Sequence, residues 1–420
     1  LPWATMTPAD LTKLVDDPRP AVREKAIQQL ATVGSAAVPA LVRVLTAARP
    51  DHLAGLDVVE ARRNAVWALT RIEGAPAREA IRSVLSDRDE SVRRAAIYAA
   101  GLWRDGAAQP HLLTAVQSIQ HALQLEAAVA LVPIGEARAV PALVEASASV
   151  SDRVLEHSLT YALIEIGNAA TTASAGLKAS APRSRRATLI ALDQIDGGQL
   201  TPEGIIPLLD SSDPVLKDTA WWIALRHPDW GAALAGFFET RMSAPDVGGA
   251  ERDDLSQKLA RFSGDSEVQA LVARLTVSGT STSSQLIALR AMAVAASTSA
   301  PAASRLKALP AVWVGALSRV VAGSPGSNDE LTREAVAVAR AVPAPKDSSV
   351  ELQSALLRVA RDPARTPAVR LDALTARAPG ATLDPDLFAL VRTSLEPAQP
   401  ASLRAAAAAV VAKASLDRSQ

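Results

Sequence analysis

Tryptophan and basic side chains, which often contact ligands, gather near the middle of the chain. The group lies between positions 221 and 230 and comprises Trp221, Trp222, Arg226, His227, Asp229 and Trp230. Trp and Arg are enriched at the energetic centres of protein interfaces, and stacked aromatic rings could also hold a base or a planar cofactor. We expect Trp221 to be buried, because it continues the apolar face of its predicted helix. The candidate partner surface is therefore the loop that carries Arg226, His227, Asp229 and Trp230.

The residues that bind metals or act as nucleophiles form no recognisable constellation. The chain has five His and no Cys, which excludes Cys-ligated zinc, iron–sulfur clusters and covalently attached haem. The only adjacent His–Glu pair is Glu156-His157, and neither HExxH nor a nucleotide-binding or nucleophile-elbow motif occurs. We expect His157 to pack on its helix or cap it. The sequence thus predicts no catalytic, cofactor or metal residues, and no cofactor bound by this chain.

Charge and hydropathy exclude two further classes of partner. Lys and Arg number 44 and Asp and Glu number 44, so the formal net charge is zero. A general nucleic-acid binder needs a basic surface, so we predict no nucleic-acid partner. The longest unbroken apolar run is residues 405–412, far below the roughly 20 residues of a membrane-spanning helix. We therefore predict no membrane insertion.

The candidate partner surface must be positioned by the elements of a repeat that runs through the first half of the chain. One position, basic in most copies, recurs at intervals of 29 to 39 residues and is occupied by Arg23, Arg62, Arg93, Gln124, Glu156, Arg185 and Lys217. Each copy holds two amphipathic patterns of helical period, such as residues 61–72 followed by 75–85. Neither helix can bury its apolar stripe alone, so successive pairs must stack. The longest interval contains an insertion around Arg49–His52.

The first copy shows the expected helix boundaries. Asp17 is a plausible N-cap with Pro18 at the first helical position, and Gly34 supplies the stop. The recurrent basic position could form a ribbon for an anionic ligand. We favour a structural ladder in which Asp17 and Asp87 pair with these side chains and tie consecutive repeats together.

The repeats lose regularity after residue 240. Residues 245–249 and the Ser/Thr-rich stretch 276–284 break the pattern, yet amphipathic helices continue to the end. We predict regular repeats over residues 1–240 and divergent helical repeats over 241–420. The predicted helices of the last third are Leu309–Val321, Leu331–Val342, Val350–Val359, Val369–Ala376, Leu387–Leu395 and Leu403–Ala414. The predicted fold is an all-α, right-handed α-solenoid of about eleven to twelve helix pairs.

The repeat unit, Asp-x-x-x-x-Val-Arg-x-x-Ala followed by Gly and Ala-Val-Pro-Ala-Leu (Ala37–Leu41, Ala139–Leu143), resembles HEAT repeats of the bilin-lyase-like class. Longer strings look like the HEAT segment of the large exported haem-binding proteins, labelled membrane-bound dehydrogenases, of planctomycete-type bacteria. These strings are Arg62–Leu69, Leu155–Glu165, Ala191–Gln194 and Arg226–Gly231. In that family the segment lies between a sugar-dehydrogenase-like β-propeller and a C-terminal cytochrome c domain.

The resemblance implies a non-catalytic docking module inside a multidomain haem-dependent dehydrogenase, with haem c held only by a flanking domain. Its partners would be proteins or neighbouring domains of the same polypeptide, in the periplasm or outside the cell. The chain begins Leu1-Pro2-Trp3 without an initiator Met, so we expect it to be a piece of a longer protein. The alternative from the same repeat class is a bilin-lyase-like enzyme domain. A lyase should have one deep polar pocket formed by several repeats, whereas a scaffold should have an extended shallow face.

Overall fold

The structure is a computed structural model of the chain. It describes residues 1–46, 58–244, 247–277, 280–297, 306–323, 329–341 and 350–416. Within these ranges the regular elements are helices, and an isolated β-bridge pairs Thr382 with Ser415. The insertion predicted at Arg49–His52 lies outside the described residues. The predicted all-α solenoid of about eleven helix pairs is confirmed.

The chain divides into two compact units. Unit 1 comprises residues 1–201 and 208–219, and unit 2 comprises residues 202–207 and 220–420. The helix α14 (Pro214–Ala224) spans the division. The sequence predicts regular repeats before residue 240 and divergent repeats after it. This boundary describes the repeat pattern and not the compact units, and it stays a prediction.

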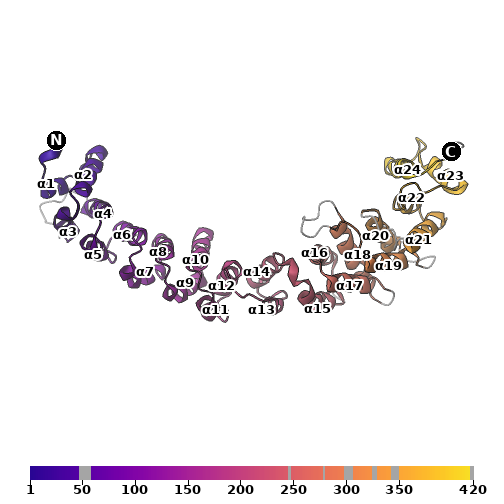
Figure 1. The fold of residues 1–420 in the computed structure, drawn as a ribbon, viewed down its shortest axis with the longest axis horizontal. Coiled ribbons are helices and arrows are strands. Elements are labelled where there is room, and N and C mark those ends of the chain that lie inside the picture. Colours follow the sequence, from indigo (N-terminus) through magenta and orange to yellow (C-terminus); the bar gives the residue numbers. More distant parts are fainter. Residues whose placement is uncertain are drawn as a thin grey trace. The chain divides into compact units, whose positions relative to one another are not determined.

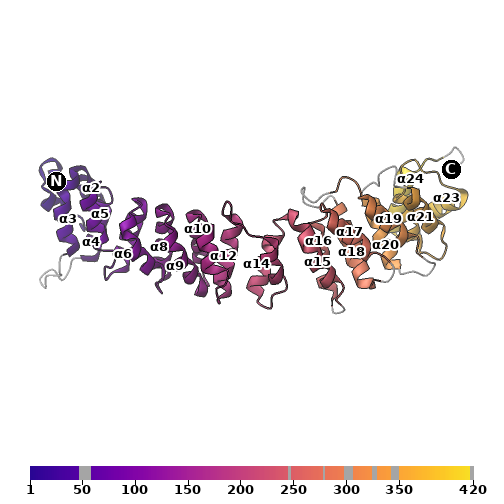
Figure 2. The ribbon, with the colours of Figure 1, turned by 60° about the horizontal axis from the view of Figure 1, so that its bottom comes forward.

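Unit 1 is a stack of helix pairs that form two rows. Each pair contributes its first helix to one row and its second helix to the other. The first helices are α2 (Pro20–Val33), α4 (Val58–Leu69), α6 (Glu90–Leu102), α8 (His121–Ile134), α10 (Arg153–Ile166) and α12 (Pro182–Gln194). The second helices are α3 (Val38–Thr46), α5 (Ala75–Arg82), α7 (Gln109–Val116), α9 (Val140–Ala146) and α11 (Ala169–Gly176). Figure 1 separates the two rows, and Figure 2 shows successive first helices lying side by side.

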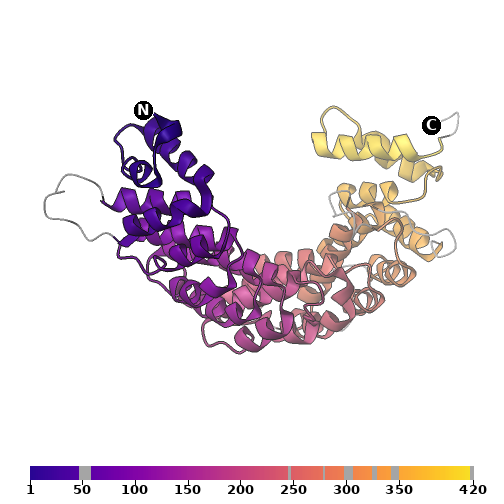
Figure 3. The ribbon, with the colours of Figure 1, turned by 60° about the vertical axis from the view of Figure 1, so that its left-hand side comes forward.

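Unit 2 repeats this arrangement. One row consists of α16 (Gly249–Ala260), α18 (Thr282–Ala296), α20 (Asp329–Ala341), α22 (Pro367–Thr375) and α24 (Ala401–Lys413). The other consists of α15 (Gly231–Met242), α17 (Ser266–Leu275), α19 (Ala311–Val321), α21 (Val350–Arg361) and α23 (Pro385–Ser394). The last helices, orange to yellow in Figure 3, stack one on another. The six helices predicted for the last third of the chain are confirmed to within two residues at either end.

The core of unit 1 follows the register of the repeat. One position of the first helices is occupied by Leu30, Leu69, Ala100, Leu131, Leu163 and Leu192, and all six side chains are buried. Small residues let the helices approach closely. A Cβ on Gly101 of α6 would lie 2.8 Å from Ala130 Cα of α8, and a Cβ on Gly176 of α11 would overlap the Thr188 side chain of α12.

The first copy confirms one predicted boundary and corrects another. Gly34 ends α2 with φ +69°, as its lack of a Cβ allows. The predicted start at Asp17 and Pro18 is wrong, since α2 begins at Pro20, and the side chain of its N-cap residue Arg19 makes no capping hydrogen bond to the helix. The Asp17 carboxylate instead accepts hydrogen bonds from the side chain and the backbone N–H of Arg19, which hold the pKa of Asp17 at about 2.

One described stretch, Pro20–Thr46, is apolar and long enough to cross a membrane when judged by length and composition alone. In the structure this stretch consists of α2, a 3-10 turn at Gly34–Ala37, and α3. Both helices contribute side chains to the core of unit 1, among them Leu30 and Leu41. The prediction that the chain does not insert into membranes stays a prediction.

Candidate functional site

The predicted partner surface lies on the turn that enters α15. Arg226 and His227 follow α14, and Pro228–Trp230 form a 3-10 turn. The backbone N–H of Trp230 donates to the His227 carbonyl oxygen at 3.0 Å. The next residue, Gly231, packs against α17, since a Cβ there would lie 2.5 Å from Asp265 Cβ. The position of the turn is therefore set by helix packing.

The four predicted residues differ in how far they reach solvent. The His227 ring stacks on the Trp230 ring, with centroids 4.2 Å apart and an angle of 9° between planes. Trp230 is only 8% exposed, so it lies beneath His227. Asp229 and Arg226 are exposed, and Asp229 Oδ1 lies 4.0 Å from His227 Nδ1. A partner at this turn would therefore meet Arg226, His227 and Asp229, and the role of the turn in binding stays a prediction.

The two neighbouring tryptophans differ in burial, since Trp221 lies in the core and Trp222 lies at the surface. Trp221 is buried, as predicted, and contacts the rings of Phe237 and Phe238, with Lys258 Nζ 4.1 Å from its ring centroid. Trp222 is 43% exposed, and the Arg226 guanidinium lies 4.8 Å from its ring centroid. This pair is a cation–π contact at the surface.

A second candidate surface, which we did not predict from the sequence, lies in unit 1. Trp67, Tyr98, Val129 and Tyr161 each follow the recurrent repeat position by five residues, on α4, α6, α8 and α10. Tyr98, Val129 and Tyr161 are 46%, 53% and 46% exposed, and Trp67 is half-buried. We call these four residues the exposed row. Monomeric proteins usually scatter exposed apolar side chains singly, so their recurrence on adjacent helices makes this row a candidate interaction surface.

Neighbouring side chains hold the row in place. The rings of Trp67 and Tyr98 meet edge to face, with centroids 5.5 Å apart. A hydrogen bond to Glu165, helped by its negative charge, raises the pKa of Tyr161. His157 packs on its helix as expected, because its exposed ring stacks on the Tyr161 ring of the same helix, with centroids 6.2 Å apart. The aromatic side chains of the row are therefore restrained in their orientations.

Arginines flank the start of the row. Arg63 and Arg94 lie one helical turn before Trp67 and Tyr98, and their side chains are 37% and 46% exposed. Arg94 lies 3.6 Å from Glu126 of the next first helix, a half-buried carboxyl group. Burial raises the pKa of Glu126 in spite of this arginine.

The recurrent basic position has the predicted structural role, although its main partners differ from those expected. Nη1 of Arg23 donates to the backbone carbonyl of Asp17, and Nη1 of Arg93 donates to that of Asp87, both at 2.7 Å. Three contacts reach the next repeat. The nearly buried Arg62 pairs with the Asp87 carboxylate, Arg23 Nε lies 3.3 Å from Glu60 Oε1, and Arg93 Nη2 donates to Gln120 Oε1 at 2.7 Å. These side chains tie repeats together, which supports the ladder over an anion-binding ribbon.

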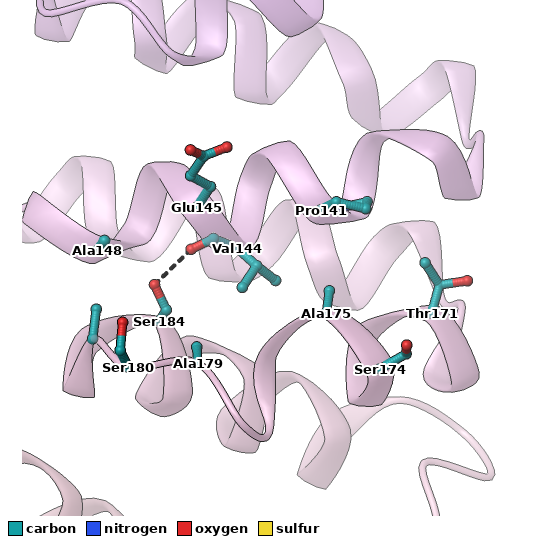
Figure 4. Close-up of a pocket in the computed structure, with 11 residues that line it drawn as sticks. Pro141, Val144, Glu145, Ala148, Thr171, Ser174, Ala175, Ala179, Ser180 and Ser184 are labelled. Carbon is teal, nitrogen blue, oxygen red and sulfur yellow. Dashed lines mark hydrogen bonds between the residues drawn. The ribbon is translucent and has the colours of Figure 1, made fainter.

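A shallow groove of about 380 Å³ lies between α9, α11 and the start of α12 (Figure 4). It arises because α11 reads Ala-Ala-Thr-Thr-Ala-Ser-Ala-Gly, with small side chains where other second helices carry Leu and Val. Ser184 closes one side by donating to the Val144 carbonyl at 2.7 Å. Glu145 is the one titratable residue of the lining. The lining is therefore poor in groups for acid–base chemistry.

Among the described residues, no group of three or more His, Asp or Glu side chains is placed to hold a metal ion. His111 lies 3.3 Å from Ser86 Oγ, and His121 is exposed at the start of α8. His52 lies outside the described residues.

Comparison with known proteins supports the repeat fold. Residues 78–164, which include α6 to α9, match the family model described as HEAT repeats. No curated protein matches the sequence. Solved structures of the karyopherin Kap121p, bound to the extreme C-terminus of the protein phosphatase Cdc14p or bound to Nup53p, are similar at 13% identity and a TM-score of 0.49. The alignment covers 88% of this chain, which spans about 45% of the length of those karyopherins. Part of the chain is thus similar to HEAT repeats, in agreement with the stacked helix pairs.

Proposed function

We propose that the chain is a non-catalytic docking module that binds a partner protein through the exposed row. The observation that carries the proposal is the recurrence of an exposed or half-buried apolar residue at one repeat position of four consecutive first helices. Trp and Tyr supply large contact areas at little cost in side-chain entropy, and they dominate binding energy in many interfaces. A solenoid multiplies such contacts, since each repeat adds one side chain to the same line.

The groove supports docking over the bilin-lyase-like alternative. A lyase of this class was expected to have one deep polar pocket formed by several repeats. The groove between α9 and α12 is shallow, and Ala, Ser, Thr, Pro and Val residues accompany Glu145 in its lining. A single carboxyl group offers no acid–base pair for catalysis.

We also infer that the parent protein is a multidomain haem-dependent dehydrogenase, and that its neighbouring domains are the partners. The support is the resemblance of strings such as Arg62–Leu69 and Arg226–Gly231 to that family. The surrounding coding region tests this part. We expect a β-propeller upstream and a CxxCH haem motif downstream, and a coding region that lacks both would contradict it.

Binding of the neighbouring domains tests the docking function. We would compare the double variant Tyr98→Ser/Tyr161→Ser with the control Ile119→Ser/Val350→Ser, whose side chains are 96% and 71% exposed in the loop before α8 and at the start of α21 in unit 2. Biolayer interferometry should show affinity at least tenfold weaker for the row variant and unchanged for the control. Both variants should give the circular dichroism spectrum of the wild-type protein, which checks that they are folded. Equal affinities for the two variants would contradict the proposed function.

A further inference from the structure

The exposed row has a spacing and a charge pattern that favour one kind of partner. We propose that it binds an extended, acidic segment of a partner protein that carries an apolar residue at every third position. The inference rests on the proposed docking function and specifies the chemistry of the ligand. It depends on three observations, namely the repeat spacing, the aromatic side chains and the flanking arginines.

Spacing favours an extended segment. The row residues lie on successive packed helices, whose axes are about 8–10 Å apart. A polyproline II segment has three residues per turn and rises about 3.1 Å per residue, so one face presents a side chain about every 9.3 Å. A β-strand presents one about every 6.6 Å on each face, which does not match. Every third residue of a polyproline II segment can therefore meet one member of the row.

The side chains of the row suit such a segment. Trp67 and Tyr98 contact each other edge to face, and Tyr161 is held by His157 and Glu165. Proline-rich segments dock on aromatic surfaces because their backbone is already ordered, so little conformational entropy is lost on binding. Restrained aromatic rings reduce the entropy lost by the solenoid in the same way.

Charge favours acidic residues in the partner. Ile190 of α12 occupies the position that is equivalent to the row. The residues that lie one helical turn before the four row residues and Ile190 are Arg63, Arg94, Leu125, His157 and Arg186, and none of them is acidic. Three of them contact carboxylates, namely Arg63 with Glu60, Arg94 with Glu126 and Arg186 with Glu156. A guanidinium has five N–H donors, so a single carboxylate contact leaves donors for a partner.

The charges also predict where the acidic residues bind. Arg71 is exposed one turn after Trp67, whereas Glu165 is exposed one turn after Tyr161. Arginines thus lie on both sides of the row at α4, and a carboxylate lies beside it at α10. The acidic residues of the partner therefore lie over α4 and α6, close to Arg63, Arg71 and Arg94.

Calorimetric titration of the full chain with synthetic peptides tests the inference. The probe is a 12-residue peptide of four Glu-Pro-Leu repeats. The controls are Lys-Pro-Leu repeats, Glu-Pro-Ser repeats and an acidic helical peptide with Leu at heptad spacing, because seven helical residues also span about 10.5 Å. We expect the Glu-Pro-Leu peptide to bind at least tenfold more tightly than each control, with affinity that falls between 50 and 300 mM salt as charges are screened.

Variants of the chain locate the site. Tyr98→Ser/Tyr161→Ser and Arg63→Gln/Arg94→Gln should each weaken peptide binding at least tenfold, and Ile119→Ser/Val350→Ser should leave it unchanged. Tighter binding of the helical or the Lys-containing peptide would overturn the inference. If no peptide binds while the neighbouring domains still require the row, the inference fails and the docking function stands. If the row variant alters neither interaction, both fail.

Discussion

Replacing Gly101 by Ala tests the packing of first helices that positions the exposed row. A Cβ at residue 101 of α6 would lie 2.8 Å from Ala130 Cα and 2.9 Å from Ala130 Cβ of α8. Carbon atoms in contact normally lie about 3.5–4.0 Å apart, so α6 and α8 would have to separate by several tenths of an ångström. Because one opposing atom belongs to the backbone, no side-chain rotation relieves the overlap.

Two opposing effects set the size of the change. Ala is favoured over Gly inside a helix by about 0.8–1.0 kcal/mol. Overpacking a core costs about 1–3 kcal/mol, and the upper half of that range applies where backbone must move. We therefore expect Gly101→Ala to lower the free energy of unfolding by about 1–2 kcal/mol.

Gly236→Ala is the matched control. Gly236 lies inside α15, and a Cβ added there would meet no atom within 4 Å, so this change should raise stability by about 0.5–1 kcal/mol. Urea denaturation followed by circular dichroism at 222 nm measures both. The two substitutions should change the free energy of unfolding in opposite directions. A Gly101→Ala protein that is as stable as the Gly236→Ala control would refute the close approach of α6 and α8.

Four further outcomes follow from the structure. Leu69→Ala should lower the free energy of unfolding by about 2–5 kcal/mol because Leu69 is fully buried. Leu102→Ala, at a 59% exposed site, should change the denaturation midpoint little. Equal effects of the two substitutions would show that the register of the repeat is wrong. Burial raises the pKa of Glu126, so the contribution of Glu126 to stability falls as the pH rises through that pKa. The Glu126→Gln variant should therefore have the melting temperature of the wild type near pH 4 and a higher one at pH 7. A lower melting temperature of the variant at pH 7 would contradict this prediction. Limited proteolysis should cut first within residues 243–250, of which 245 and 246 lie outside the described residues, and not within residues 60–230. Haem and zinc should leave the melting temperature unchanged, and one tightly bound equivalent of either would contradict the prediction that this chain binds no cofactor.

The repeat made the fold predictable from the sequence. The buried position of the first helices, from Leu30 to Leu192, follows from aligning the copies on their apolar residues, and Gly34 marks the end of α2 as expected. The start of α2 was less predictable, because Asp17 and Asp87 occur where an N-cap would stand. In the structure Asp17 and Asp87 accept backbone bonds before the helix and offer their carbonyl groups to Arg23 and Arg93.

The surface was less predictable than the core. Trp230 looked like a contact residue because of its type, yet it lies under His227. The exposed row was missed because Tyr98 and Val129 are apolar, and an apolar residue on a helix suggests burial. A signal was present, since the position five residues after each recurrent side chain reads Trp, Tyr, Val, Tyr from α4 to α10. Aligning the copies at every position would have found it.

Site-specific photo-cross-linking tests the central claim most directly. The full chain would carry p-benzoylphenylalanine at Tyr98 or Tyr161 of the row, or at Ile119 or Val350 as controls, in the cells that produce the protein. Mass spectrometry of the products then identifies the cross-linked segment. We predict that both row positions link to one defined protein segment and that the control positions do not. Products that are the same from row and control positions, or none from the row, would contradict the claim that the exposed row is a docking surface.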